Sequence, residues 1–374
     1  MKKILILLPA FIAGFFMYSG QNFKEAPEKW NQNPAMTRII PTGEYNRLPQ
    51  EDFKNPVYST EPRIISTEQG DYVVTPSFFV HPSNNDQSET PITRHPSNPN
   101  IMFASSNAYL GGSDFSTGVY VTTNGGLNWF GSDTLNNGVF NYGDPGPAID
   151  NTGKFYMSYI SRTGNIGVTY STNNGINWST ESILPGSSTS SDKNFTATDN
   201  FPSSPYYGRC YIVYTEFGST NYGRINISYT TNGGSSWSNI TPVSPPRAPN
   251  HLHMGADIKV NRLGEVNVVW ANVIENGQNS TEDSLGFAKS TDGGVTWVTS
   301  QSNVSNMNGI RAQNLYNNTR SNGFPRIDID VTGGPRNGWI YAVTSEKFEA
   351  PATDSADAIL HRSTDGGNTW TSVR

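Results

Sequence analysis

The sequence predicts an all-β fold, a β-propeller of four-stranded antiparallel blades, and two observations carry this prediction. The first is an eight-residue pattern: a hydroxyl residue leads, Asp or Asn and Gly follow, and Trp ends it. The pattern occurs five times, starting at Thr122, Ser171, Thr230, Ser290 and Ser363. The second is a pair of aromatic, β-branched strand-like runs before the copies. Each unit thus predicts four short antiparallel strands, and four such strands in roughly 40–50 residues are typical of a propeller blade.

Each copy of the pattern has the composition of a tight hairpin turn. In the copy at Ser290, Asp292-Gly293 lies between two apolar runs, and Asp-Gly in that setting is a strong hairpin signal because Gly adopts positive φ freely. The Asp carboxylate and the Ser hydroxyl can accept hydrogen bonds from the turn's own backbone N–H groups. Trp297 then supplies a large side chain to bury. We therefore expect five internally bonded β-hairpins.

The repeats and their flanking strands divide the chain into five expected blades. Their boundaries are 91–135, 143–185, 195–243, 254–300 and 324–374. The runs between Pro62 and Val80 predict a further strand pair that opens this region. Because the visible count is five, we expect six or more blades in the full ring. The missing strands would come from residues 21–80 or from a C-terminal region beyond Arg374.

The repeated pattern resembles the Asp-box, or BNR repeat, of bacterial sialidases and related secreted propellers. The resemblance covers the five turns and their preceding strands, from about Ile92 to Trp370. It implies a sialidase-like propeller directed at extracellular glycans or glycoproteins. In that family the repeated turns lie on the rim, away from the substrate.

The N-terminus predicts export. Lys2 and Lys3 precede an apolar run from Ile4 to Met17, followed by small residues; this is the pattern of a signal peptide, and the run is too short to span a membrane. We assign residues 1–20 to the signal peptide, 21–60 to a leader or linker, and 61–374 to the propeller. The mature protein is therefore expected to be secreted or at the cell surface.

Charge and cysteine content narrow the function classes. Charged residues make up 15% of the chain and the net charge is −6, so there is no basic footprint for nucleic acid. Cys210 is the single cysteine, which rules out an internal disulfide. Its position in an aromatic strand predicts a buried side chain rather than a nucleophile.

The resemblance also implies a type of chemistry. Sialidases clamp the substrate carboxylate with arginines, use a Tyr activated by Glu as nucleophile, and use an Asp as acid and base; they are exceptions to the two-carboxylate scheme of other glycosidases. The candidates for these roles here are Glu216, Tyr316, Arg311, Arg326 and Asp192. Glu346 occupies a place similar to that of Glu216. For each candidate a plain structural role is the alternative, such as a solvated strand end or, for Asp192 with Lys193, a local ion pair.

No cofactor or metal motif is evident in the sequence. His251 and His253 lie two apart on one predicted strand, which suits a metal, but no third ligand has suitable spacing. Acidic and Asn-rich loops would permit calcium without forming a recognisable ligand run.

Two function hypotheses follow. The first is an exo-glycosidase of sialidase type, or a glycan-binding relative of one. The second is a non-catalytic, protein-binding or structural propeller of a larger secreted or cell-surface protein. It is kept because neither Arg38-Ile39-Ile40-Pro41 nor Pro62-Arg63-Ile64-Ile65 matches the Arg-Ile-Pro segment typical of sialidases.

Overall fold

A computed structural model describes residues 63–67, 70–74, 80–111, 114–218, 221–311, 321–347 and 356–373. The predicted signal peptide and leader lie outside these residues. The described part is all-β, as predicted, and its one helical element is a 3₁₀ turn, η4 (Gly277–Asn279). The strand pair expected between residues 62 and 80 is present as an antiparallel hairpin of β1 (Arg63–Thr67) and β2 (Gly70–Val74).

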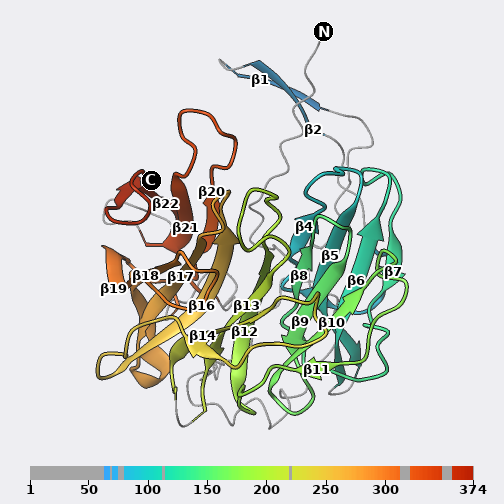
Figure 1. The fold of residues 1–374 in the computed structure, drawn as a ribbon, viewed down its shortest axis with the longest axis horizontal. Helices are drawn as coiled ribbons and strands as arrows, with labels where there is room; N and C mark the ends of the chain where they lie inside the picture. The colour runs from blue at the N-terminus through green and yellow to red at the C-terminus, as the bar shows by residue number, and fades with distance from the viewer. Residues whose placement is uncertain are drawn as a thin grey trace, which may run out of the picture.

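Five antiparallel sheets follow this hairpin, and Figure 1 shows them succeeding one another across the molecule, from β4–β7 to β20–β22. The first sheet has five strands, because β3 and β4 both pair with β5. Its strands are β3 (Gln87–Ser88), β4 (Ile92–Arg94), β5 (Met102–Gly111), β6 (Asp114–Thr122) and β7 (Phe130–Ser132).

The other four sheets have four strands each, hydrogen-bonded in chain order. The second contains β8 (Gly146–Ile149), β9 (Phe155–Ile160), β10 (Ile166–Ser171) and β11 (Ser182–Ile183). The third contains β12 (Ser191–Thr198), β13 (Cys210–Glu216), β14 (Arg224–Thr230) and β15 (Thr241–Pro242).

The fourth sheet contains β16 (His251–Val260), β17 (Val266–Ile274), β18 (Thr281–Ser290) and β19 (Thr299–Asn306). The fifth contains β20 (Arg326–Ile329), β21 (Ile340–Glu346), β22 (Asp357–Ser363) and β23 (Thr371–Val373). These sheets match the five expected blades to within a few residues at each end. The expectation of six or more blades concerns parts of the ring outside the described residues.

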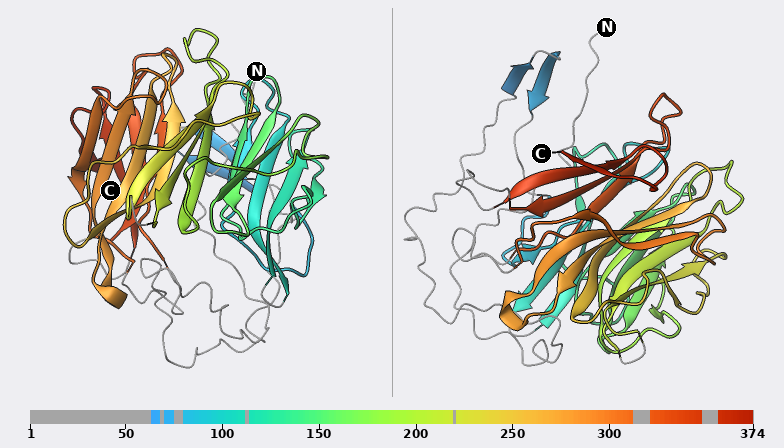
Figure 2. Two further views of the ribbon diagram at one scale, coloured as in Figure 1. Left: turned by 60° about the horizontal axis from the view of Figure 1, so that its bottom comes forward. Right: turned by 90° about the vertical axis from the view of Figure 1, so that its left-hand side faces the viewer.

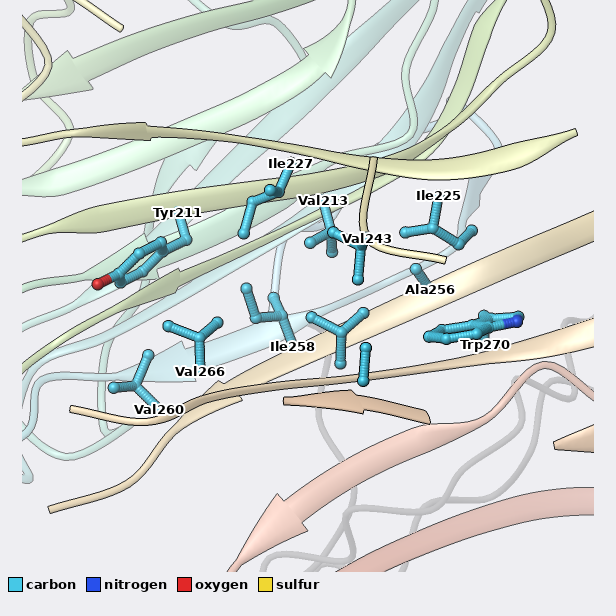
Figure 3. Packing of buried hydrophobic residues seen from close by; sticks show 12 residues of the cluster. Tyr211, Val213, Ile225, Ile227, Val243, Ala256, Ile258, Val260, Val266 and Trp270 are labelled. Atoms are coloured by element: carbon cyan, nitrogen blue, oxygen red, sulfur yellow. The ribbon is translucent and has the colours of Figure 1, made fainter. Parts of the chain in front are cut away.

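The hydrophobic core lies between the sheets rather than within one of them. Successive sheets pack face to face (Figure 2), and a separate cluster of buried side chains fills each of the four boundaries between them. Strand β13 shows how one strand serves two boundaries, because its side chains alternate between its two faces. Ile212 and Tyr214 pack toward the second sheet, whereas Tyr211 and Val213 pack toward the fourth. Figure 3 shows the latter cluster, in which Val213 belongs with Ile258 and Trp270 to one buried group.

The five repeated turns are built alike. Each follows the last residue of the strand that precedes a sheet's final strand, and the hydroxyl of that residue accepts a hydrogen bond from the N–H of the Gly four residues on, at 2.8–3.0 Å. In the fourth turn, Ser290 also donates to Asp292 Oδ1 (2.8 Å), which in turn accepts from Thr296 N (2.8 Å). The predicted hairpins are therefore confirmed, and the Asp292 carboxylate accepts a hydrogen bond from the backbone N–H four residues on.

Two consecutive residues in each turn adopt positive φ. They are glycines in four turns, and in the second turn the pair is Asn174 (φ 57°) and Gly175 (φ 78°). Asn tolerates this left-handed conformation better than other residues with a Cβ. The pattern therefore selects Gly or Asn at these two positions for backbone reasons.

Candidate active face

The sheets have two distinct ends. In each sheet, the residue that ends the next-to-last strand pairs with the residue that begins the strand before it, as in Cys210↔Thr230 and Val266↔Ser290. The turns of successive sheets lie at the same end, because Lys154 and Arg209, which precede β9 and β13, each donate to a Gly carbonyl in the next sheet's turn. We call this end the turn face. The first strands β8, β12, β16 and β20 begin at the opposite end, here called the inner-strand face.

A cluster of ionisable groups lies at the inner-strand face where β8 and β12 begin. We call it the carboxylate cluster, and its members are Glu89, Asp144, Asp192 and Lys193. The Lys193 ammonium pairs with the Glu89 carboxylate and lies 3.6 Å from Asp144 Oδ2. The Asp192 carboxyl interacts with that of Asp144. Three segments distant in sequence thus bring three carboxyl groups around one ammonium.

Backbone conformation places these groups. Glu89 (φ 50°), Asp144 (φ 54°) and Lys193 (φ 52°) are three of the five non-glycine residues with positive φ in the described chain. Such conformations cost energy and are concentrated at functional sites. At Lys193 the cause is a β-bulge between Asp192 and Phe195, which inserts residues into β12 and turns the Lys193 side chain toward Asp144.

Burial sets the electrostatics of the cluster. Asp144 is buried, the Lys193 side chain is 12% exposed, and the Glu89 side chain is 43% exposed. Burial, together with the neighbouring Asp192 carboxyl, raises the pKa of Asp144, and Lys193 only partly opposes this. Burial would lower the pKa of Lys193, but the Asp144, Glu89 and Asp192 carboxylates outweigh it and raise that pKa. The result is a carboxyl group whose pKa lies above its usual value, beside an ammonium that keeps its charge.

Neutral side chains form hydrogen bonds around the carboxylate cluster. Asn107 accepts from Asp144 N (2.6 Å) through its Oδ1 and donates to Asp144 Oδ1 (3.4 Å) through its Nδ2. Asn194 donates to the Ser158 hydroxyl (2.6 Å), which is hydrogen-bonded to Thr196 (2.7 Å). These bonds fix both the Asp144 backbone and the start of β12.

Glu216, a predicted site residue, is the last residue of β13 and is buried. Its carboxylate accepts hydrogen bonds from Ser188 N (3.1 Å), from the Ser188 hydroxyl and from Gly218 N (2.6 Å). Ser191, whose backbone pairs with that of Glu216, directly precedes Asp192. Glu216 therefore fixes the 187–191 segment that leads into the carboxylate cluster.

Two further buried glutamates anchor loops at the same face. Glu282 accepts from Arg311 N (3.1 Å) and Gly323 N (2.7 Å). Glu346, the predicted counterpart of Glu216, accepts from Asn308 N (2.9 Å) and pairs with the buried His361 at 3.0 Å. Buried carboxylates that accept hydrogen bonds from backbone N–H groups thus recur at this face.

The remaining predicted site residues are distributed as follows. Arg326, at the start of β20, stacks on Phe195 of β12, with 4.3 Å between the guanidinium carbon and the ring centroid. This contact brings Arg326 beside the strand that carries Asp192. Arg311 lies over the Phe324 ring at 5.7 Å, a contact separate from the carboxylate cluster. Tyr316 lies outside the described residues.

The two histidines of the expected pair have different environments. His251 Nε2 lies 3.2 Å from Asp283 Oδ2 near the surface. His253 is buried, bonds Ser244 through Nδ1 (2.7 Å), and has its pKa lowered to about 4 by burial and by nearby Arg224. Within the described residues, no group of three His, Cys, Asp or Glu side chains is arranged to hold a metal ion. Cys210 is buried, as predicted.

Sequence reasoning found Asp192 and named its neighbour Lys193, but it did not find Asp144 or Glu89. Asp144 precedes β8 and Glu89 lies between β3 and β4, so both stand outside any repeated pattern. Pairing across three segments and a bulge at Lys193 leave no signal of fixed spacing in the sequence. The Asp-Pro in Gly143-Asp144-Pro145-Gly146 predicts a turn and nothing more.

Solved structures share the fold of this chain at low sequence identity. A protein of unknown function from Dyadobacter fermentans has a TM-score of 0.52 and 11% identity, over 77% of this chain and 82% of the other. An α-L-arabinanase from Penicillium chrysogenum has a TM-score of 0.50 and 12% identity, over 78% and 83%. The α-L-arabinofuranosidase Arb93A from Fusarium graminearum has a TM-score of 0.51 and 13% identity, over 78% and 82%.

The fold is a β-propeller. It is shared with glycoside hydrolases that act on arabinose-containing substrates, and at such identities the likeness shows the fold alone. No family model and no curated protein sequence matches the chain. Among the described residues of this propeller, no helix is long and apolar enough to span a membrane.

Proposed function

We propose that this chain is an exported propeller that acts on extracellular glycans at its inner-strand face, with the carboxylate cluster as its acid–base group. The observation that carries the proposal is the raised pKa of Asp144 beside Lys193 and Asp192. Glycoside hydrolysis needs a carboxylic acid that still holds its proton near neutral pH, with a second carboxyl group close by. The glycosidase propellers of similar fold support the substrate class.

In this proposal Asp144 donates a proton to the glycosidic oxygen as its bond to the sugar carbon breaks. The more exposed Glu89 carboxylate stabilises the positive charge that develops on the sugar ring and assists the incoming water. Lys193 holds both carboxyl groups in place, and Arg326, stacked on Phe195, binds hydroxyl or carboxylate oxygens of the substrate. The sialidase-type assignment, in which Tyr316 is the nucleophile, is the competing scheme.

Release of 4-methylumbelliferone from a panel of conjugates tests the proposal, with α-L-arabinofuranoside and sialic acid conjugates included. We expect Asp144→Asn to lower kcat/KM by about 10²–10⁴-fold, the usual contribution of a general acid. The matched control is Asp328→Asn, which neutralises a carboxylate with an 80% exposed side chain outside the cluster and should stay within about twofold of wild type.

Two results contradict this assignment. Activity lost in Tyr316→Phe but kept in Asp144→Asn assigns the chemistry to the sialidase scheme. Absence of turnover on every conjugate, with glycan binding retained, supports the non-catalytic alternative.

A further inference from the structure

A pocket of about 220 Å³ lies at the outer rim, at the boundary between the first and second sheets. We call it the rim pocket. Val119 of β6 and Phe130 of β7 line one side, and Ile176 and Trp178 of the second repeated turn line the other. These residues belong to outer strands and a turn, whereas the carboxylate cluster lies where the first strands begin. The rim pocket is therefore a separate site.

The pocket presents apolar surface that the fold leaves uncovered. Phe130 is 42% exposed and Ile176 is 60% exposed. The Trp178 N–H donates to Gly175 O at 3.0 Å within its own turn, so the indole offers an apolar ring surface rather than a donor. At the next boundary the corresponding Trp237 is buried in the core. The first boundary thus leaves Trp178 half-buried against Phe103, whereas the second covers Trp237.

The rim of the pocket is polar but uncharged. Ser132, Thr134 and Asn136 line it, and none of the pocket's lining residues carries a charge. An apolar floor with a few neutral hydrogen-bonding groups complements a neutral sugar ring, whose C–H face is apolar and whose edge carries hydroxyl groups. An anionic ligand would find no cation here.

The size of the pocket favours the same ligand. Pockets for drug-sized ligands have volumes of about 300–1,000 Å³, so this smaller one suits a single sugar ring. A docking protein chain would need a larger contact area, of about 800 Å² per partner. The neighbouring edge strand β7, only three residues long, offers little backbone for strand addition.

From this geometry we infer that the rim pocket is a secondary binding site for one ring of a neutral polysaccharide. The site holds the polymer at the rim while the inner-strand face acts on another part of it. This role does not depend on catalysis, since a non-catalytic propeller would use the pocket in the same way.

Native electrophoresis in gels containing soluble arabinan, xylan or galactan tests the inference on the full-length mature chain. We expect at least one of these neutral polymers to retard the wild type, and Phe130→Ala with Ile176→Ala to weaken the dissociation constant by about tenfold or more. Both side chains are exposed, so the double variant should fold. Leu263→Ala, which removes another exposed apolar side chain, is the matched control and should bind as wild type.

Asp144→Asn separates this inference from the proposed function, because it should abolish turnover and leave retardation unchanged. The inference is overturned if none of the three polymers retards the wild type, or if the double variant is retarded equally. It is also overturned if sedimentation shows wild-type self-association that the double variant loses, since the patch would then be a protein interface.

Discussion

Replacing Lys193 by Met tests the electrostatics of the carboxylate cluster most directly. The variant keeps most of the side-chain volume and removes the single ammonium that faces Glu89 and Asp144. Removing one partner of a buried ion pair costs about 3–5 kcal/mol, because it leaves an uncompensated charge. In this cluster, however, the fraction of Asp144 that is ionised in the wild type can escape the penalty by taking up a proton, so the loss has an upper limit that depends on pH.

The limit follows from proton linkage. Unfolded Asp titrates near pH 3.9, and each pH unit above this value costs about 1.36 kcal/mol for a carboxyl that stays protonated in the folded state. The upper limit of the stability loss is therefore about 4 kcal/mol at pH 7 and about 1.5 kcal/mol at pH 5. Because the raised native pKa of Asp144 makes the folded state bind more protons than the unfolded state, its contribution to stability falls as pH rises above the unfolded value. Lys193, whose own pKa is raised, stays charged in both folded and unfolded states here.

Urea unfolding followed by tryptophan fluorescence at pH 5 and pH 7 measures the effect. We expect Lys193→Met to destabilise the protein more at pH 7 than at pH 5, and a second change, Asp144→Asn, to recover most of the loss. Lys259→Met is the matched control, since its ammonium lies 3.9 Å from Asp328 with both side chains exposed and should matter little. Equal destabilisation at the two pH values, or less than about 1 kcal/mol at pH 7, would refute the reasoning.

Four further predictions concern the scaffold. Ser290→Ala removes the three hydrogen bonds of one turn hydroxyl, to Asp292 Oδ1, Asp292 N and Gly294 N, and should destabilise by about 1–3 kcal/mol in urea unfolding; a change within error would mean that the turn closes without it. Gly367→Ala should cost more than about 2 kcal/mol, because φ is 95° and the new Cβ would lie 2.0 Å from a Phe287 ring carbon; a wild-type melting temperature would contradict this. Glu282→Gln weakens bonds to two backbone N–H groups and should cost about 1–3 kcal/mol, measured by urea midpoint. His253 has a pKa of about 4 and should stay neutral at pH 5, as measured by NMR. Stability should fall as pH is lowered from 6.5 to 4, because the His in the unfolded state gains its proton first. His253→Gln should flatten that fall.

The architecture was predictable because its signals are local. Each turn carries its hydroxyl, Asx and Gly residues within eight positions, and a continuous apolar run such as Cys210–Tyr214 of β13 is typical of a strand buried on both faces. The blades could therefore be bounded from the sequence to within a few residues. The Asx bond to the fourth following residue needed coordinates, since spacing alone does not say which N–H group an Asp or Asn oxygen accepts.

The candidate site was only partly predictable because its contacts are not local. Asp192 and Arg326 were found, but Asp144 and Glu89 join the cluster through positive-φ backbone and a bulge, which no pattern of residue types encodes. Glu216 and Glu346 stand at strand ends as expected, and the structure shows what their carboxylates bind there. In a single sequence, a buried acid that collects backbone N–H groups looks the same as one that meets a substrate.

The self-contained bonding of the repeated turns also bears on how such a chain can grow. Copies of the turn begin 49 to 73 residues apart (171−122 and 363−290), yet their internal hydrogen bonds are nearly identical in length. A duplicated segment that includes these eight residues contains both partners of the hydrogen bonds that close the turn. The turn therefore forms without a matching change elsewhere in the chain. Insertions can then accumulate between copies without disturbing them. The sheets can therefore diversify at the inner-strand face while the opposite rim stays constant.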